Sequence, residues 1–220
     1  MGNIRLIAFD IDGTVANSKK EISSSFFDFV DRHNEYQFVA ASGRQYYSLV
    51  KTFGRIKDKL IFLSDNGSLI TMNDKVLYTN QISNDDVRNV LDIVVGFENV
   101  GVYMGCVHGS YMMRRDERFM GEFLVYNDRM EVVDDLKSVL DQDEVIKIAL
   151  FYPNKDALIQ SEKFPPLPDN MCAIVSGDEW IDISLKENSK GHALRVIQEM
   201  LNVSYDETMW AASPVIPPED

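Results

Sequence analysis

Two aspartates separated by a single residue follow directly after an apolar run near the start of the chain. Asp10 closes the run Ile4–Phe9, and Asp12 stands in a turn with Gly13. A carboxylate at the end of a buried strand is costly unless it is paired or bound to a cation. A bound cation would keep Asp10 ionised and nucleophilic, while Asp12 could hold a proton and act as a general acid. The alternative is a solvated turn, but the apolar run in front of the pair favours a functional site.

Two further polar clusters each follow an apolar run. Ser42-Gly43 comes after the second run, and Asn66-Gly67 comes after the third. Ligands of open parallel sheets bind beyond the carboxyl ends of the strands. We therefore expect the three clusters to converge on one crevice, although each taken alone could be an ordinary turn.

The elements that must position these clusters alternate between strand and helix over the first eighty residues. The predicted strands are 4–9, 38–41 and 60–63, with a hairpin of 69–72 and 76–78 after them. One predicted helix begins near Ser23 or Ser24, and another runs from 46 to 53. This alternation predicts a parallel sheet covered by helices on both faces.

From about residue 82 the pattern changes to strands mixed with short helices. A helix is predicted at 85–95, and strands at 100–106, 110–114, 146–152, 173–176 and 180–184. We therefore expect an α/β, Rossmann-like core of residues 1–81 and 185–220, with an α+β domain of residues 82–184 inserted into it. Ser189 is the expected N-cap of a helix over 190–201. Three prolines between 214 and 218 argue against a strand in the segment 210–220.

Composition and charge exclude several classes of protein. The 220 residues are 45% hydrophobic and 26% charged, which is typical of a globular chain. A net charge of −13 argues against nucleic acid or an anionic membrane as a general partner. The N-terminus does not resemble a signal peptide, and no apolar stretch approaches the ~18–20 residues needed to cross a membrane, so we expect a cytoplasmic protein. An anionic small molecule is still compatible, because a bound metal ion reverses the local field.

The run Phe9-Asp10-Ile11-Asp12-Gly13-Thr14 resembles the nucleophile motif of the haloacid dehalogenase superfamily, and Ala41-Ser42-Gly43-Arg44 resembles its second motif. The segments Ser64-Asp65-Asn66-Gly67 and Ser189-Lys190-Gly191 are similar to those of its Cof-type subfamily of sugar-phosphate phosphatases. In that subfamily a large α/β cap is inserted between the second and third motifs, where residues 82–184 lie in this chain.

The resemblance implies an Mg²⁺-dependent phosphatase of small phosphorylated metabolites. Asp10 would attack phosphorus, Asp12 would protonate the leaving group and then activate water, and Lys190 would neutralise transition-state charge. Asp10 and Asp12 would also hold the Mg²⁺ ion. The residues implied in binding the substrate or its phosphate are Ile11, Asp12, Ser42, Gly43, Arg44, Asn66 and Lys190. For Arg44 the sequence leaves a second interpretation open, namely pairing with surface acids.

The family's fourth motif, which supplies further acidic metal ligands, is not recognisable after Tyr205-Asp206-Glu207-Thr208-Met209. We therefore expect a core that is incomplete at its C-terminal end and weak or absent activity. The strand carrying Asp10 is then expected at a sheet edge, which leaves self-association into a homo-oligomer open. Two alternatives to the phosphatase are a phosphosugar mutase and an inactive protein that binds phosphorylated ligands.

Overall fold

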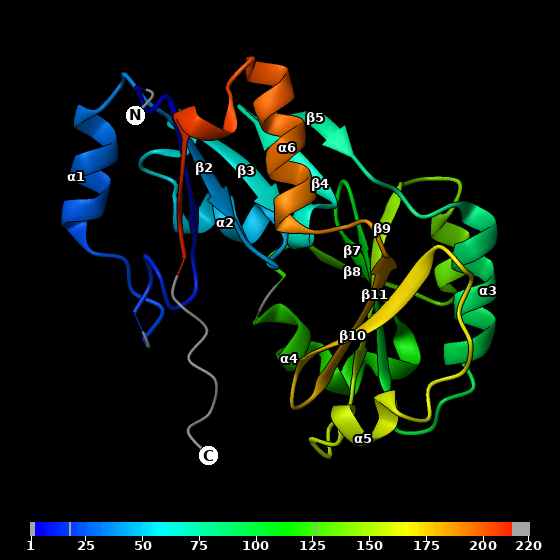
Figure 1. Cartoon of the computed structure of the whole chain (residues 1–220). Coiled ribbons are helices and arrows are strands. Elements are labelled where there is room, and N and C mark those ends of the chain that lie inside the picture. Colours follow the sequence, from blue (N-terminus) through cyan, green and yellow to red (C-terminus); the bar gives the residue numbers. More distant parts are fainter. Residues whose placement is uncertain (1–2, 18, 126, 213–220) are drawn as a thin grey trace, which may run out of the picture. The chain divides into compact units, whose positions relative to one another are not determined.

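The computed structural model describes residues 3–17, 19–125 and 127–212 of the chain. The chain divides into two compact units, Met1–Tyr78 with Ser189–Asp220, and Thr79–Asn188 (Figure 1). The sequence had placed these boundaries a few residues away, after 81 and after 184. Within the described residues, no helix is both long and apolar enough to cross a membrane.

The first unit is built on a six-stranded sheet in the order β12-β1-β2-β3-β4-β5. Its strands are β1 (Leu6–Asp10), β2 (Gln37–Ala41), β3 (Leu60–Ser64), β4 (Leu69–Met72), β5 (Lys75–Thr79) and β12 (Thr208–Ala211). Its helices are α1 (Ser24–Arg32), α2 (Tyr46–Thr52) and α6 (Lys190–Leu201), with the short 3₁₀ turns η1 (Lys57–Lys59), η2 (Asp65–Gly67) and η5 (Tyr205–Glu207). Strands β12, β1, β2 and β3 are parallel, and β4 is antiparallel to β3.

Apolar side chains cover both faces of this sheet. On one face, Ala193 and Ile197 of α6 pack with sheet residues such as Leu6 and Leu63 in one buried cluster. On the other face, Phe9 of β1 contacts the rings of Phe26 and Phe53 from α1 and the end of α2. Because both faces are buried, β1, β2 and β3 appear in the sequence as nearly continuous apolar runs, and the predicted α/β core is confirmed.

Local sequence signals account for the ends of several elements. The hydroxyl oxygen of Ser23 accepts a hydrogen bond from the amide of Ser25 and caps α1. The predicted hairpin turns at Asn73 and Asp74, whose φ angles are 52° and 59°. Asn and Asp tolerate positive φ better than most residues, and two consecutive positive φ values suit a tight hairpin turn.

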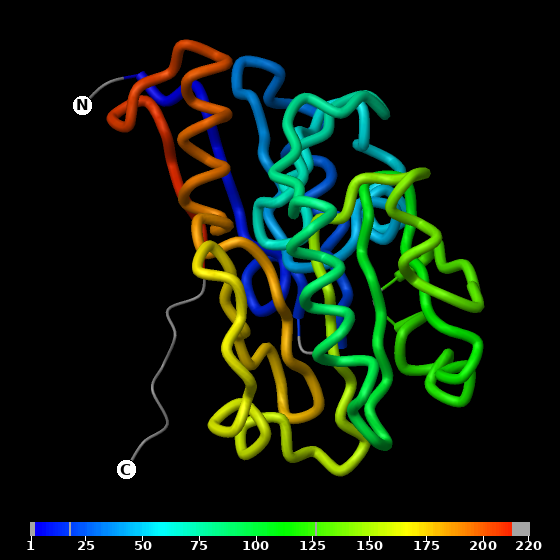
Figure 2. The backbone as a smooth tube through the Cα atoms, turned by 90° about the vertical axis from the view of Figure 1, so that its right-hand side faces the viewer, coloured from blue at the N-terminus to red at the C-terminus, as the bar shows by residue number. Residues whose placement is uncertain are grey.

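The expectation that the strand carrying Asp10 lies at a sheet edge is wrong. Strand β12 pairs with β1 in parallel, with Leu6 opposite Thr208 and Phe9 opposite Ala211. Figure 2 shows this red segment running beside the blue N-terminal strand. The segment 210–220 was predicted to form no strand because of its prolines, but Trp210 and Ala211 precede the first of them and keep their amide donors. The remainder, 213–220, lies outside the described residues.

The second unit is a mixed sheet in the order β10-β11-β9-β6-β7-β8. Its strands are β6 (Gly101–Cys106), β7 (Ser110–Met113), β8 (Met130–Val133), β9 (Val145–Phe151), β10 (Met171–Gly177) and β11 (Trp180–Leu185). Its helices are α3 (Asn84–Val94), α4 (Met120–Leu124) and α5 (Ala157–Ser161), with the 3₁₀ turns η3 (Arg114–Phe119) and η4 (Leu136–Val139). In this sheet β7 and β8 pair in parallel, and the other neighbouring strands are antiparallel. The predicted α+β layer is therefore present.

Two buried clusters stabilise the second unit. Helix α3 contributes Val87, Val90 and Leu91 to the larger cluster. The smaller cluster is aromatic and includes Phe123 of α4 and Phe151 of β9, with Trp180 packed against it. The sequence does not predict β8 and α5, because both are short and lie largely at the surface, so neither carries a strong apolar pattern.

Candidate active site

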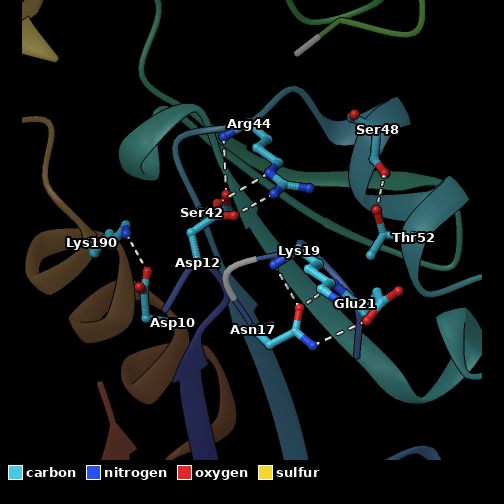
Figure 3. Close-up of polar contacts among 10 residues, drawn as sticks. All are labelled: Asp10, Asp12, Asn17, Lys19, Glu21, Ser42, Arg44, Ser48, Thr52 and Lys190. Atoms are coloured by element: carbon cyan, nitrogen blue, oxygen red, sulfur yellow. Dashed lines mark hydrogen bonds and ion pairs between the residues drawn. The ribbon is translucent and has the colours of Figure 1, made fainter. Parts of the chain in front are cut away.

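Side chains from three segments of the first unit meet at the carboxyl ends of β1 and β2 (Figure 3). Asp10 is the last residue of β1 and lies opposite Ala41, the last residue of β2. Asp12 follows in the turn after β1, and Ser42 begins the loop after β2. Lys190 comes from the first turn of α6, far away in sequence.

The Lys190 ammonium is bonded to the carboxylate of Asp10. Its Nζ lies 2.5 Å from Asp10 Oδ1, and the two side chains keep 32% and 21% of their surface exposed. Lys190 is held there by the start of α6, where the Ser189 hydroxyl accepts a hydrogen bond from the amide of His192. A cation in the first turn of a helix opposes the helix dipole, and the carboxylate of Asp10 offsets that cost.

The carboxylate of Asp12 is held by both arms of the Arg44 guanidinium. Arg44 Nε donates to Asp12 Oδ2 at 3.1 Å, and Arg44 Nη2 donates to Asp12 Oδ1. The Arg44 side chain is largely buried, whereas that of Asp12 is half-exposed. The acid that pairs with Arg44 is therefore Asp12, a residue of the site. The sequence alone leaves open whether Arg44 contacts the substrate or pairs with surface acids. The bidentate geometry fixes the direction in which Asp12 points.

The loop after β2 is tightly held by its own hydrogen bonds. The Ser42 amide donates to the carbonyl of Leu63 at 2.9 Å, and the Ser42 hydroxyl oxygen accepts from the amide of Arg44 at 3.1 Å. Ser42 is 2% exposed. The hydroxyl predicted to bind phosphate therefore lies in a buried, ordered turn beside Asp12.

The turn after β1 places the other predicted phosphate-binding groups. Ile11 is fully buried, and its carbonyl accepts hydrogen bonds from the amides of Thr14 and Ala16. Gly13 adopts a φ of +77°, which favours glycine, and its amide donates to Ala16. These bonds form a tight turn after β1. From this turn the side chains of Asp10 and Asp12 contact different partners, Lys190 and Arg44.

The side chain of Asn66 packs against the backbone of Gly43. A Cβ added to Gly43 would lie 2.9 Å from Asn66 Oδ1, so a larger residue at this position would require the Asn66 side chain to move. The Asn66 amide donates to the Ser42 carbonyl at 3.1 Å. The sequence identified both residues by their turn signals but gave no indication of this contact.

The site offers Mg²⁺ oxygen ligands only, which is the chemistry that this ion prefers. Mg²⁺ is commonly held by one or two carboxylates together with substrate phosphate and water, so Asp10 and Asp12 fit that pattern. In the described part of the chain, no group of three acidic, His or Cys side chains could hold a metal ion.

The chain matches the family of haloacid dehalogenase-like hydrolases over residues 7–211. That match covers nearly the whole chain and includes every residue of the site. The chain belongs to the haloacid dehalogenase-like hydrolases. It is 25% identical over 214 residues to the 5-amino-6-(5-phospho-D-ribitylamino)uracil phosphatase YbjI of Escherichia coli, covering 94% of this chain and 78% of that protein.

Two further relatives agree with this assignment. Phosphatase YwpJ of Bacillus subtilis is 23% identical over 234 residues, covering 93% of this chain and 81% of that protein. A crystal structure from Eubacterium rectale superposes with a TM-score of 0.82 at 26% identity, covering 95% of this chain and 81% of that one. This haloacid dehalogenase-like hydrolase is accordingly a phosphatase.

Proposed function

We propose that this phosphatase hydrolyses phosphate monoesters of small metabolites in an Mg²⁺-dependent reaction through an aspartyl-phosphate at Asp10. The observation that carries the proposal is the Asp10 carboxylate at the end of β1, with the Lys190 ammonium 2.5 Å away. A carboxylate nucleophile needs a neighbouring cation to offset the charge that develops on the transferred phosphoryl group.

In the proposed first step, an oxygen of Asp10 attacks phosphorus and the bond from phosphorus to the ester oxygen breaks. Asp12 gives its proton to the leaving oxygen. In the second step, Asp12 takes a proton from water, the water oxygen attacks phosphorus, and the acyl-phosphate bond breaks to release inorganic phosphate and Asp10. Mg²⁺ held by oxygens of Asp10 and Asp12 would supply further neutralisation of the phosphoryl charge.

Arg44 limits when Asp12 can act as the acid. Both Asp12 oxygens accept N–H groups of Arg44, so neither is free to donate a proton in this arrangement. A guanidinium binds phosphate and carboxylate in the same forked geometry. We propose that the anionic substrate draws Arg44 from Asp12, while the Ser42 hydroxyl and the backbone at Gly43 bind the phosphoryl oxygens.

For the substrate, we propose a phosphorylated sugar or a similar polyhydroxylated molecule. This follows the Cof-type likeness of the motifs, and the Escherichia coli relative is named for a phosphorylated ribityl compound. The large second unit, residues 79–188, is the part of the chain that would select among such substrates.

Phosphate release from a panel of sugar phosphates and 5-amino-6-(5-phospho-D-ribitylamino)uracil tests the proposal. We expect turnover with Mg²⁺ that is weak because the fourth motif is not recognisable, loss of this turnover in excess EDTA, and recovery when Mg²⁺ is restored. Asp10→Asn should lower kcat by at least about 10³-fold, as expected for a nucleophile. The matched control is Asp141→Asn, because Asp141 is an exposed aspartate of the second unit.

Three other outcomes would contradict the proposal. Formation of an isomeric sugar phosphate without release of free phosphate would identify a mutase. No turnover, together with a melting temperature raised by the same ligands, would identify a binding protein. Turnover that survives Asp10→Asn would place the chemistry elsewhere.

A further inference from the structure

The turn after β3 has a backbone conformation that few residues adopt. Asp65, Asn66 and Gly67 have φ angles of 47°, 57° and 101° in succession. Such a run costs free energy and persists only where the surroundings hold it. Here the Asp65 amide donates to the Arg44 carbonyl and the Asn66 amide donates to the Ser42 carbonyl, both at 3.1 Å. The turn is therefore fastened to the loop that carries Ser42 and Arg44.

The same turn also touches the first turn of α6. A Cβ added to Gly67 would lie 2.6 Å from the Ser189 carbonyl oxygen and 3.0 Å from the Ala193 Cβ. The Ser189 carbonyl accepts the amide of Ala193 at 3.0 Å. The helix therefore begins in direct contact with the backbone of Gly67, at a distance that no other residue allows.

Lys190 is the residue after Ser189 in the chain. Its position relative to Asp10 consequently depends on where α6 begins, and Gly67 determines how closely that beginning approaches the sheet. The turn of residues 65–67 therefore contacts two parts of the site. It is hydrogen-bonded to the loop that carries Ser42 and Arg44, and it packs against the start of the helix that carries Lys190.

We propose that Gly67 is a positioning residue, which sets the first turn of α6 so that the Lys190 ammonium reaches the Asp10 carboxylate. The inference deepens the proposed function, because Lys190 and Asp10 are its reacting pair. Gly67 itself touches neither the substrate nor the reacting atoms in this scheme. Its effect passes through Ser189 and Ala193 to Lys190.

The test measures the rate at which Lys190 is acetylated by trace amounts of an amine reagent, read by peptide mass spectrometry on the folded full chain. Gly67→Ala should raise this rate by about two- to fivefold, the factor expected when an ion pair of this kind is lost. Asp10→Asn is the positive control, because it removes the partner of Lys190 directly. Lys51, exposed on α2, is the internal reference and should not change.

Gly54→Ala is the matched control variant. Gly54 lies in the same unit, its added Cβ would meet only ordinary contacts of 3.6 and 3.8 Å, and its φ is not positive. This variant should leave the acetylation rate of Lys190 unchanged. If Gly67→Ala does not fold, Ala193→Val probes the same contact from the helix side and carries the same expectation.

Two results would overturn the inference. One is a folded Gly67→Ala variant in which Lys190 reacts at the wild-type rate. The other is an equal rise at Lys190 and Lys51, which would indicate general loosening. Acetylation does not require turnover, so a chain without phosphatase activity would refute the proposed function and leave this measurement intact.

Discussion

Replacing Lys190 by Met separates its role in chemistry from its role in folding. Methionine keeps an unbranched apolar side chain but removes the ammonium that lies 2.5 Å from Asp10 Oδ1. If Lys190 stabilises the transition state, its loss should lower kcat by about 10²–10³-fold, or ~2.7–4 kcal/mol, as for the removal of one strong preorganised donor.

The expected effect on folding is much smaller, because two contributions oppose each other. A partly exposed ion pair contributes about 0.2–1 kcal/mol, and this is lost. Removal of a cation from the first turn of α6 relieves an unfavourable helix-dipole interaction of about 0.3–1 kcal/mol. The net change in the free energy of unfolding should stay within about 1 kcal/mol, or a shift of about 2–4 °C in Tm for a chain of this size.

The assay is steady-state phosphate release under saturating substrate, run beside thermal unfolding of the same preparations. Lys186→Met is the matched control, because Lys186 is exposed and precedes the helix. A Lys190→Met enzyme that retains kcat within about fivefold of the wild type would refute a role in the transition state. A loss of stability above about 2 kcal/mol would show that the ion pair mainly supports the fold.

Two further predictions concern the ends of α6 and β12. Ser189→Ala removes the hydroxyl that accepts from the His192 amide, and it should lower the free energy of unfolding by ~1 kcal/mol in urea titrations, whereas an unchanged midpoint would contradict the cap. Hydrogen bonds from the Ser204 amide and hydroxyl, and then the Arg5 side chain, hold the pKa of Glu207 below its ordinary value. A lowered carboxyl pKa adds stability above the unfolded-state pKa of about 4.3 and loses it as pH falls through the folded-state pKa. The Tm difference between wild type and Glu207→Gln should therefore shrink as the pH falls from about 6 to about 3, and a constant difference would contradict this role.

The parts of the molecule that depend on neighbouring residues in sequence could be predicted. Helix α6 begins at Lys190 after its Ser189 cap, as expected, because capping is decided within one turn. The positions of Asp10 and Ser42 at strand ends followed from the alternation of apolar runs with polar turns. These are the features that periodicity and turn chemistry specify.

Contacts between distant segments could not be predicted in the same way. Strand β12 forms because its backbone pairs with Leu6–Phe9, about two hundred residues earlier, and a run of four residues, three of them apolar, is too short to predict a strand by itself. The bidentate pair of Arg44 with Asp12 and the approach of Gly67 to Ser189 likewise join separate elements. Residue types set what these groups can do, but the fold alone decides which of them meet.

The most direct test of the account is to trap the intermediate on Asp10. The enzyme is mixed with a turnover substrate and Mg²⁺, quenched in acid within the first turnover, and reduced with borohydride before peptide mass spectrometry. The account predicts that Asp10 is converted to homoserine, that Asp12 is unchanged, and that Asp10→Asn yields no such product. Phosphate release with Asp10 unmodified, or modification at a different residue, would contradict the proposed chemistry.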